Sequence, residues 1–241
     1  MKKKILSLVL AVLLIVPAMF MLSACAPSTI EVSTYAELKQ ALKGNNDIIK
    51  VTADINVEDS LVVGRKVILD LNGKKLYNEN DIWDKSPNSW SIISVRKNGN
   101  LTLKGNGKVI TKENDCCALD VIDGGKLVVE DGEYVGNVSA VYAYDGAVEI
   151  KGGKYSIQQL NTNKVEGPYG LTINIYNNND ASKPQLAKKA TVSITGGRFV
   201  NFNPSTDNPN DELVAEGYVA REYMGDGEGA EKGFEVRPAA E

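Results

Sequence analysis

One pattern repeats between residues 91 and 202: a short alternating strand, a glycine turn and a second alternating strand. It recurs in residues 93–103, 119–129 and 141–150. The equivalent positions Val95, Val121, Ala143 and Ile175 are 26, 22 and 32 residues apart. Periods of this length are typical of solenoids, whose units bury their apolar faces only by stacking, and a propeller blade would need about 40 residues. The repeat therefore predicts an all-β parallel β-helix of about five or six coils.

Alternation at period 2 predicts which side chains point into this β-helix. The expected inward ladders are Ile93/Val95, Leu119/Val121, Val141/Ala143 and Ile173/Ile175. Glycines at the corners between strands would supply positive φ or permit close approach of the backbone.

The N-terminus has the features of a secretory signal peptide in residues 1–24: three lysines at 2–4, an apolar run and small residues before the cut. The residues Leu22-Ser23-Ala24-Cys25 resemble the lipobox of bacterial lipoproteins, in which the cysteine becomes the lipidated N-terminus. This resemblance implies lipidation of Cys25 and an extracytoplasmic, membrane-anchored protein at the cell surface. The alternative for the apolar run is a transmembrane anchor.

Residues 25–32 then form a tether, and residues 34–43 an N-terminal capping helix. Thr34 with Glu37 makes a capping box, Ala36, Leu38, Ala41 and Leu42 form an apolar stripe, and Gly44 is a stop signal. The β-helix domain is expected over residues 33–223. The acidic, glycine-rich residues 224–241 predict a C-terminal hairpin and tail.

Two segments in the first part of the domain carry a family resemblance. The strand ending Thr52-Ala53-Asp54-Ile55 and the segment Leu69-Asp70-Leu71-Asn72-Gly73-Lys74 resemble the opening of secreted right-handed β-helix proteins of the pectin-lyase-like superfamily. This resemblance implies a right-handed β-helix. It leaves function open, because the family includes adhesion-like surface proteins as well as polysaccharide lyases and glycoside hydrolases.

Charge and cysteine content exclude several functions. Removing residues 1–24 takes away three of 27 basic residues and none of 31 acidic ones, which leaves a net charge of −7 and argues against nucleic acid as a partner. The chain has no histidine, so Ser-His, Cys-His and His-metal chemistry are excluded, and neither a metal nor a cofactor is expected. The adjacent Cys116 and Cys117 are interpreted as small apolar residues, with a strained vicinal disulfide or an intermolecular bridge as alternatives.

A candidate ligand surface follows from the positions that alternate with the inward ladders. Three polar interruptions, at residues 78–90, 158–169 and 177–189, are also expected to be long loops of the kind that often carry function. The expected column of solvent-facing residues is Ser94, Arg96, Asp120, Ile122, Tyr142, Tyr144, Asn174 and Tyr176. The first loop carries both tryptophans, Trp83 and Trp90, and would enter this column, as would the loop ending at Tyr169. Aromatic rings beside amides and carboxylates suit a sugar chain. The predicted ligand-binding residues are therefore Trp83, Trp90, Arg96, Asp120, Tyr142, Tyr144, Asn174 and Tyr176. The alternatives are tyrosines that only pack on the sheet and a tryptophan loop that folds back over the coil.

An enzyme would need two carboxyl groups at a defined separation, or Ca²⁺ with a basic residue. Asp120, Asp123 and Asp145 recur in successive coils near Arg96, but the two that precede glycines are ordinary turn residues. No catalytic residue is therefore assigned. The sequence favours a lipid-anchored adhesion protein that binds extracellular polysaccharide or a host glycan; the alternatives are a carbohydrate-active enzyme and a purely structural envelope protein.

Overall fold

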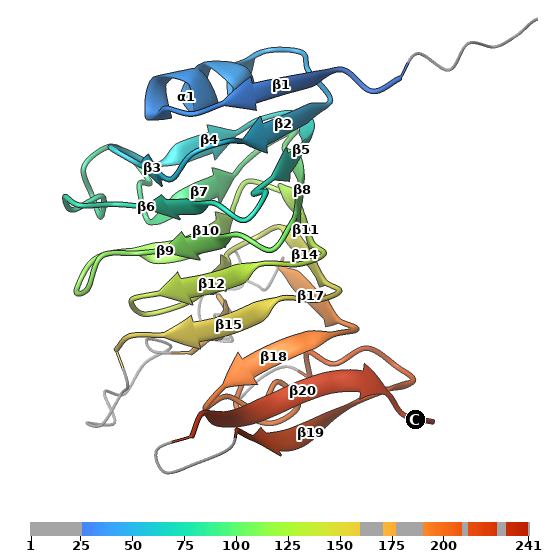
Figure 1. Cartoon of the computed structure of the whole chain (residues 1–241). Coiled ribbons are helices and arrows are strands. Elements are labelled where there is room, and N and C mark those ends of the chain that lie inside the picture. The colour runs from blue at the N-terminus through green and yellow to red at the C-terminus, as the bar shows by residue number, and fades with distance from the viewer. Residues whose placement is uncertain (1–25, 160–170, 177–189, 209–211, 226–229, 241) are drawn as a thin grey trace, which may run out of the picture.

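A computed structural model describes residues 26–159, 171–176, 190–208, 212–225 and 230–240. In it the chain winds into a parallel β-helix (Figure 1), which confirms the predicted fold. The predicted signal peptide, Cys25, most of the second interruption including Tyr169, and the third interruption lie outside the described residues.

Three sheets form the walls of the β-helix. Sheet A contains, in spatial order, β1 (Thr29–Val32), β2 (Ile48–Val51), β5 (Lys66–Asp70), β8 (Asn100–Lys104), β11 (Lys126–Val129), β14 (Ala147–Ile150) and β17 (Thr191–Ile194). Sheet B contains β3 (Ile55–Asn56), β6 (Lys75–Tyr77), β9 (Lys108–Ile110), β12 (Glu133–Gly136), β15 (Lys154–Ile157), β18 (Gly197–Val200), β20 (Lys232–Pro238) and β19 (Tyr218–Met224). Sheet C contains β4 (Leu61–Val63), β7 (Ser91–Val95), β10 (Cys117–Val121), β13 (Val141–Ala143) and β16 (Ile173–Ile175).

Each complete coil runs from sheet C to sheet A to sheet B, so the five strands of sheet C define five complete coils. The strands of sheet C pair in the predicted register: Leu119 lies between Ile93 and Val141, and Val121 lies between Val95 and Ala143. All four predicted ladder pairs are buried. The inward ladders are therefore confirmed.

The interior also holds an aromatic stack that continues from coil to coil. Tyr134 stacks on Tyr155 with ring centroids 5.4 Å apart, and Tyr155 stacks on Phe199 at 5.0 Å. Both tyrosine hydroxyls donate to backbone carbonyl oxygens at the corner before their strand, so their polar ends are satisfied although the rings are buried. Each of these rings stands two residues after a glycine in the sequence, so the same local pattern places one aromatic side chain inside each of three successive coils.

Glycine is required where successive coils approach at the corner between sheets C and A. A Cβ atom on Gly125 would lie 2.5 Å from the carbonyl oxygen of Val95, and one on Gly146 would lie 2.5 Å from that of Gly125. Only residues without a side chain allow the backbones to stack this closely at this corner.

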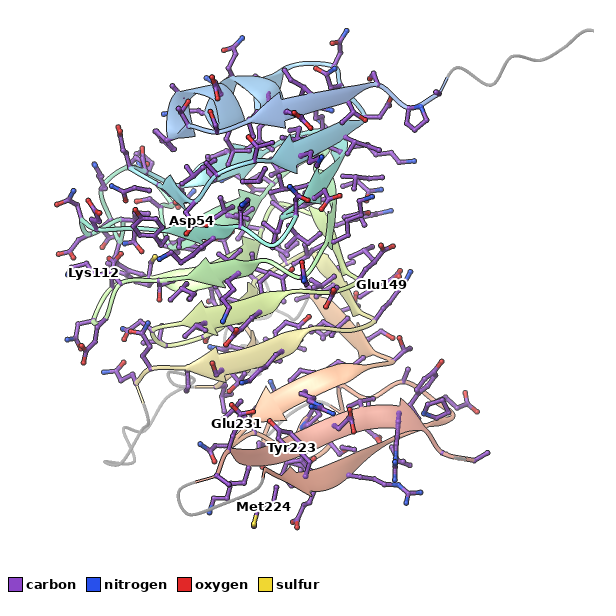
Figure 2. All side chains as sticks on the ribbon, viewed as in Figure 1. Asp54, Lys112, Glu149, Tyr223, Met224 and Glu231 are labelled. Carbon is purple, nitrogen blue, oxygen red and sulfur yellow. The ribbon has the colours of Figure 1, made fainter. Side chains whose placement is uncertain are left out.

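Both ends of the β-helix are capped (Figure 1). Helix α1 (Tyr35–Lys43) begins with the predicted capping box, Thr34 with Glu37, and buries Leu38, Ala41 and Leu42 on the first coil; Ala36, expected in the apolar stripe, is instead exposed. At the other end β20 pairs antiparallel with β18 and β19, which forms the final hairpin. Figure 2 shows Tyr223, Met224 and Glu231 at the end of this hairpin where β19 leads into β20. Among the described residues, no helix combines the length and apolar character that crossing a membrane requires.

Candidate functional site

The described connections from sheet B to sheet C lie along one edge of the β-helix. The longest described connection, residues 78–90, joins β6 to β7 and is called the Trp loop here. Shorter connections at residues 111–116 and 137–140 follow in the next coils. Lys112, which lies on this edge in Figure 2, forms an ion pair of 2.7 Å with Asp81 of the Trp loop. Loops of three coils therefore meet beside the outer face of sheet C.

A buried carboxylate fixes the first half of the Trp loop. Asp115 accepts hydrogen bonds from the backbone N–H groups of Ile82 and Trp83, both at 2.9 Å, and from the Asn78 side chain at 2.6 Å. Ile82 is completely buried, so the loop inserts an apolar side chain into the molecule at the same point. The first half of the Trp loop is therefore anchored to the β-helix by hydrogen bonds and by a buried apolar side chain.

Arg96 fixes the second half of the Trp loop. Its Nη2 donates to the carbonyl oxygen of Asn88 at 2.9 Å, and its Nε donates to Ser94 Oγ at 3.0 Å. Ser94 Oγ in turn donates to Asp120 at 2.6 Å, and Ser91 Oγ donates to the other carboxylate oxygen at 2.7 Å. Arg96, predicted as a ligand-binding residue, is thus a positioning residue for the loop.

The expected solvent exposure of the column on sheet C is wrong for half of its members. Ser94, Asp120, Ile122 and Asn174 are buried. For Ser94 and Asp120 the reason is the Trp loop, because its Asn88 carbonyl oxygen accepts a hydrogen bond from Arg96, which is hydrogen-bonded through Ser94 to Asp120. Loss of water raises the pKa of Asp120 to about 6, although the hydrogen bonds from Ser94 and Ser91 and the charge of Arg96 act in the opposite direction.

The predicted aromatic residues do come together. Trp90 lies 6.2 Å from Tyr142 and 5.9 Å from Tyr144, and Tyr144 stacks on Tyr176 at 4.6 Å. These four half-buried residues form an aromatic cluster on the outer face of sheet C. Trp83 differs from them, because 42% of its surface is exposed. The alternative of a loop that folds back over the coil therefore describes Trp90 but not Trp83.

A pocket of about 360 Å³ lies between the Trp loop and the aromatic cluster. Its lining residues are Trp83, Asp84, Trp90, Cys117, Val138, Ser139, Tyr142, Asn174 and Tyr176. Its volume is at the lower end of the range for small-molecule sites, about 300–1,000 Å³. This aromatic pocket contains five of the eight predicted ligand-binding residues; Arg96, Asp120 and Tyr144 lie outside its lining.

Sequence reasoning missed Asp84, Cys117, Val138 and Ser139 as lining residues. Asp84 directly follows Trp83 in a loop that was already predicted to carry function. Its position beside Trp83 could therefore have identified it as a lining residue. Val138 and Ser139 belong to a four-residue connection with no unusual composition, and only the stacking of coils brings that connection beside the Trp loop.

The two cysteines are chemically quiet. Both thiols are free and buried, and burial raises the pKa of each well above the ordinary thiol range. They are therefore uncharged and unreactive in the folded protein. The structure thus places them as small apolar residues, with Cys117 in the wall of the aromatic pocket.

The remaining candidate carboxylates belong to turns. Asp123 adopts a φ of 55°, and Asp145 accepts a hydrogen bond from the backbone N–H of Gly124 at 3.3 Å. Asp84 is the one acidic residue in the pocket lining. Within the described ranges, no group of three or more acidic or sulfur-bearing side chains is arranged to hold a metal ion.

Comparison with known proteins gives one match. The family model described as "Putative pectate lyase-like adhesive domain" matches residues 29–201, a segment that runs from β1 to just beyond β18 and includes all the residues of the aromatic pocket. No curated protein matches the chain. No solved structure matches it either.

Proposed function

Since the chain belongs to the family of pectate lyase-like adhesive domains, we propose that it is a surface adhesion protein that binds a glycan in the aromatic pocket. The ligand would be an extracellular polysaccharide or a host glycan. Lipidation of Cys25 would hold the protein on the outer side of the membrane, with the β-helix exposed to its ligand.

The observation that carries this proposal is the fixed position of Trp83. Its side chain is partly exposed, at 42%, and its backbone N–H is held by Asp115. An exposed tryptophan on an ordered loop offers a sugar a flat apolar surface without the cost of ordering that loop on binding. The half-buried Tyr142 and Tyr176 supply further aromatic surface in the same pocket.

Polar groups around these rings support a sugar rather than a purely apolar ligand. Asp84 offers carboxylate oxygens, and the tyrosine hydroxyls can both donate and accept hydrogen bonds. Sugar hydroxyl groups need such partners, whereas the C–H face of the sugar ring packs on the aromatic rings.

A glycan array probed with residues 26–241 tests the proposal, because this segment contains every described element. The wild type is compared with Trp83→Ala and with Tyr223→Ala, a control on the C-terminal hairpin. We expect the wild type and the control to bind the same glycans, and Trp83→Ala to lose at least about tenfold in affinity, as expected for removal of a central aromatic contact.

Trp83→Ala should still fold and unfold cooperatively, because Ile82 and the contacts of Asp115, which anchor this part of the loop, do not involve the Trp83 side chain. Equal binding by the wild type and Trp83→Ala would contradict the pocket as the binding site. The absence of binding to any glycan would contradict the glycan-binding function.

A further inference from the structure

The charged side chains in the described lining of the aromatic pocket are of one sign only. Among the nine lining residues that the structure describes, Asp84 is the single carboxylate and none is a lysine or an arginine. The Cys117 thiol adds no charge, because burial raises its pKa. The described lining is therefore negative where it is charged at all.

The cations of the Trp loop and of the next connection are engaged away from the pocket. Lys85, which follows Asp84 directly, donates from Nζ to the carbonyl oxygen of Glu58 at 2.6 Å. Lys112 pairs with Asp81 at 2.7 Å. Neither residue lines the pocket.

Arg96 is also directed elsewhere. Its guanidinium bonds Ser94 and Asn88, and with Lys39 and Lys43 it lines a separate hollow of about 210 Å³ that also contains Ser86 of the Trp loop. Arg96 therefore lines another hollow, together with the acidic Asp59, and does not line the aromatic pocket.

From this distribution of charge we infer that the aromatic pocket takes an uncharged sugar residue and that Asp84 makes it reject uronic acids. The inference rests on the proposed glycan-binding function. A uronate would bring a second carboxylate beside Asp84 without a cation or a described metal site to compensate it, so both repulsion and desolvation oppose its binding. An uncharged sugar has neither cost and can still stack on the rings.

The backbone conformation at Asp84 permits a substitution that removes only the charge of the side chain. Asp84 has a φ of 56°, a left-handed conformation that asparagine also tolerates well. Its backbone N–H donates to the carbonyl oxygen of Ser89 at 3.2 Å, an interaction that does not depend on the side chain. Asp84→Asn therefore removes the charge and leaves the loop in place. Asp81→Asn is the matched control, because Asp81 lies in the same loop and outside the pocket lining.

The experiment measures the affinity of the full chain for pairs of oligosaccharides. Each neutral glucose, galactose or mannose oligosaccharide is paired with its counterpart oxidised to a carboxylate at C6, and oligogalacturonides are tested as methyl esters and as free acids. For every pair with a bound member, we expect the uncharged form to bind at least about tenfold more tightly at low salt. Asp84→Asn should bind the acid form more tightly, so the ratio of the affinities for the uncharged and the acid form should fall at least about threefold. Asp81→Asn should leave this ratio unchanged.

Three results would overturn the inference in distinguishable ways. Trp83-dependent binding of a free acid that equals or exceeds that of its uncharged partner would refute the inference but leave glycan binding intact. An unchanged difference in Asp84→Asn would refute the role of Asp84. If no member of any pair bound, the proposed function would fail together with the inference.

Discussion

The Asp115 carboxylate accepts a hydrogen bond of 2.9 Å from the backbone N–H of Trp83, a residue 32 positions earlier in the chain. The same carboxylate bonds the N–H of Ile82 and the side chain of Asn78. One buried side chain in the connection between β9 and β10 thus determines where an exposed tryptophan lies in the coil before it. Positioning of the candidate site is therefore distributed over successive coils.

Replacement of Asp115 by alanine should release the Trp loop. Two backbone N–H groups and one amide would lose their acceptor, and each buried group left without a partner costs roughly 1–3 kcal/mol. Because opening of the loop lets water satisfy some of them, we expect the free energy of unfolding to fall by about 3 kcal/mol in urea denaturation. Tryptophan emission, which in this chain comes only from Trp83 and Trp90, should shift to longer wavelength.

Asp81→Asn provides the control for this experiment. It removes only an ion pair between the exposed side chains of Asp81 and Lys112, and such pairs contribute little to stability. If Asp115→Ala matched this control in both stability and emission, the loop would be held by something other than Asp115.

Asp120 should make stability depend on pH in an unusual direction. Burial raises its pKa from the model-compound value of 3.8 to about 6, so the folded protein binds this proton more tightly than the unfolded chain does. The resulting stabilisation is fully present below pH 4 and is lost as the pH rises through 6. Relative to Asp120→Asn, the wild type should lose up to roughly 3 kcal/mol of stability between pH 4 and pH 7.

The comparison with Asp120→Asn is needed because other carboxyl groups act in the opposite direction. The pKa values of Glu37 and Asp47 are lowered by hydrogen bonds from backbone N–H groups, first of all those of Ser33 and Ser28. Their contributions are the same in both proteins and cancel in the difference. Parallel stability curves for the two proteins would show that Asp120 does not titrate in this range.

The fold could be predicted from the sequence because its determinants are local and repeated. Val95, Val121 and Ala143 occupy the same place in a period of one coil, and stacking requires the same register in every coil. Alternation along the strand then determines which side chains point inward. The capping box at Thr34 is equally local, since donors and acceptors lie three residues apart.

The site could be predicted only in part, because its loops follow no period. The predicted column of solvent-facing residues on sheet C correctly placed Tyr142, Tyr144 and Tyr176 next to one another. Burial of Asp120 could not be foreseen, because it depends on where a 13-residue loop lies. The contacts that decide this, from Asp115 to Trp83 and from Arg96 to Asn88, join residues on irregular backbone whose positions no alternation specifies.

A charge introduced into the inward ladder should unfold the domain, whereas the same charge on the outer face should be tolerated. Val121→Asp would place a carboxylate at a completely buried position between Val95 and Ala143, without a partner. We expect aggregation, or loss of the cooperative unfolding transition followed by circular dichroism. Val62→Asp is the matched control, because Val62 lies on a strand of the same sheet but is 42% exposed. A soluble, cooperatively folded Val121→Asp protein would contradict the register of the ladder.

Replacement of Cys25 by serine should release the protein from membranes. Lipid attachment requires the thiol of Cys25, and stable anchoring needs more than one acyl chain. Serine has no thiol, so Cys25→Ser should carry no lipid anchor. Immunoblots of membrane and soluble fractions should show the wild type in membranes, even after a high-salt wash, and Cys25→Ser in the soluble fraction. Cys116→Ser controls for loss of a thiol, because that residue is buried in the β-helix, and it should stay in the membrane fraction. Persistent attachment of Cys25→Ser with an uncleaved N-terminus would instead indicate that residues 5–22 act as a transmembrane anchor.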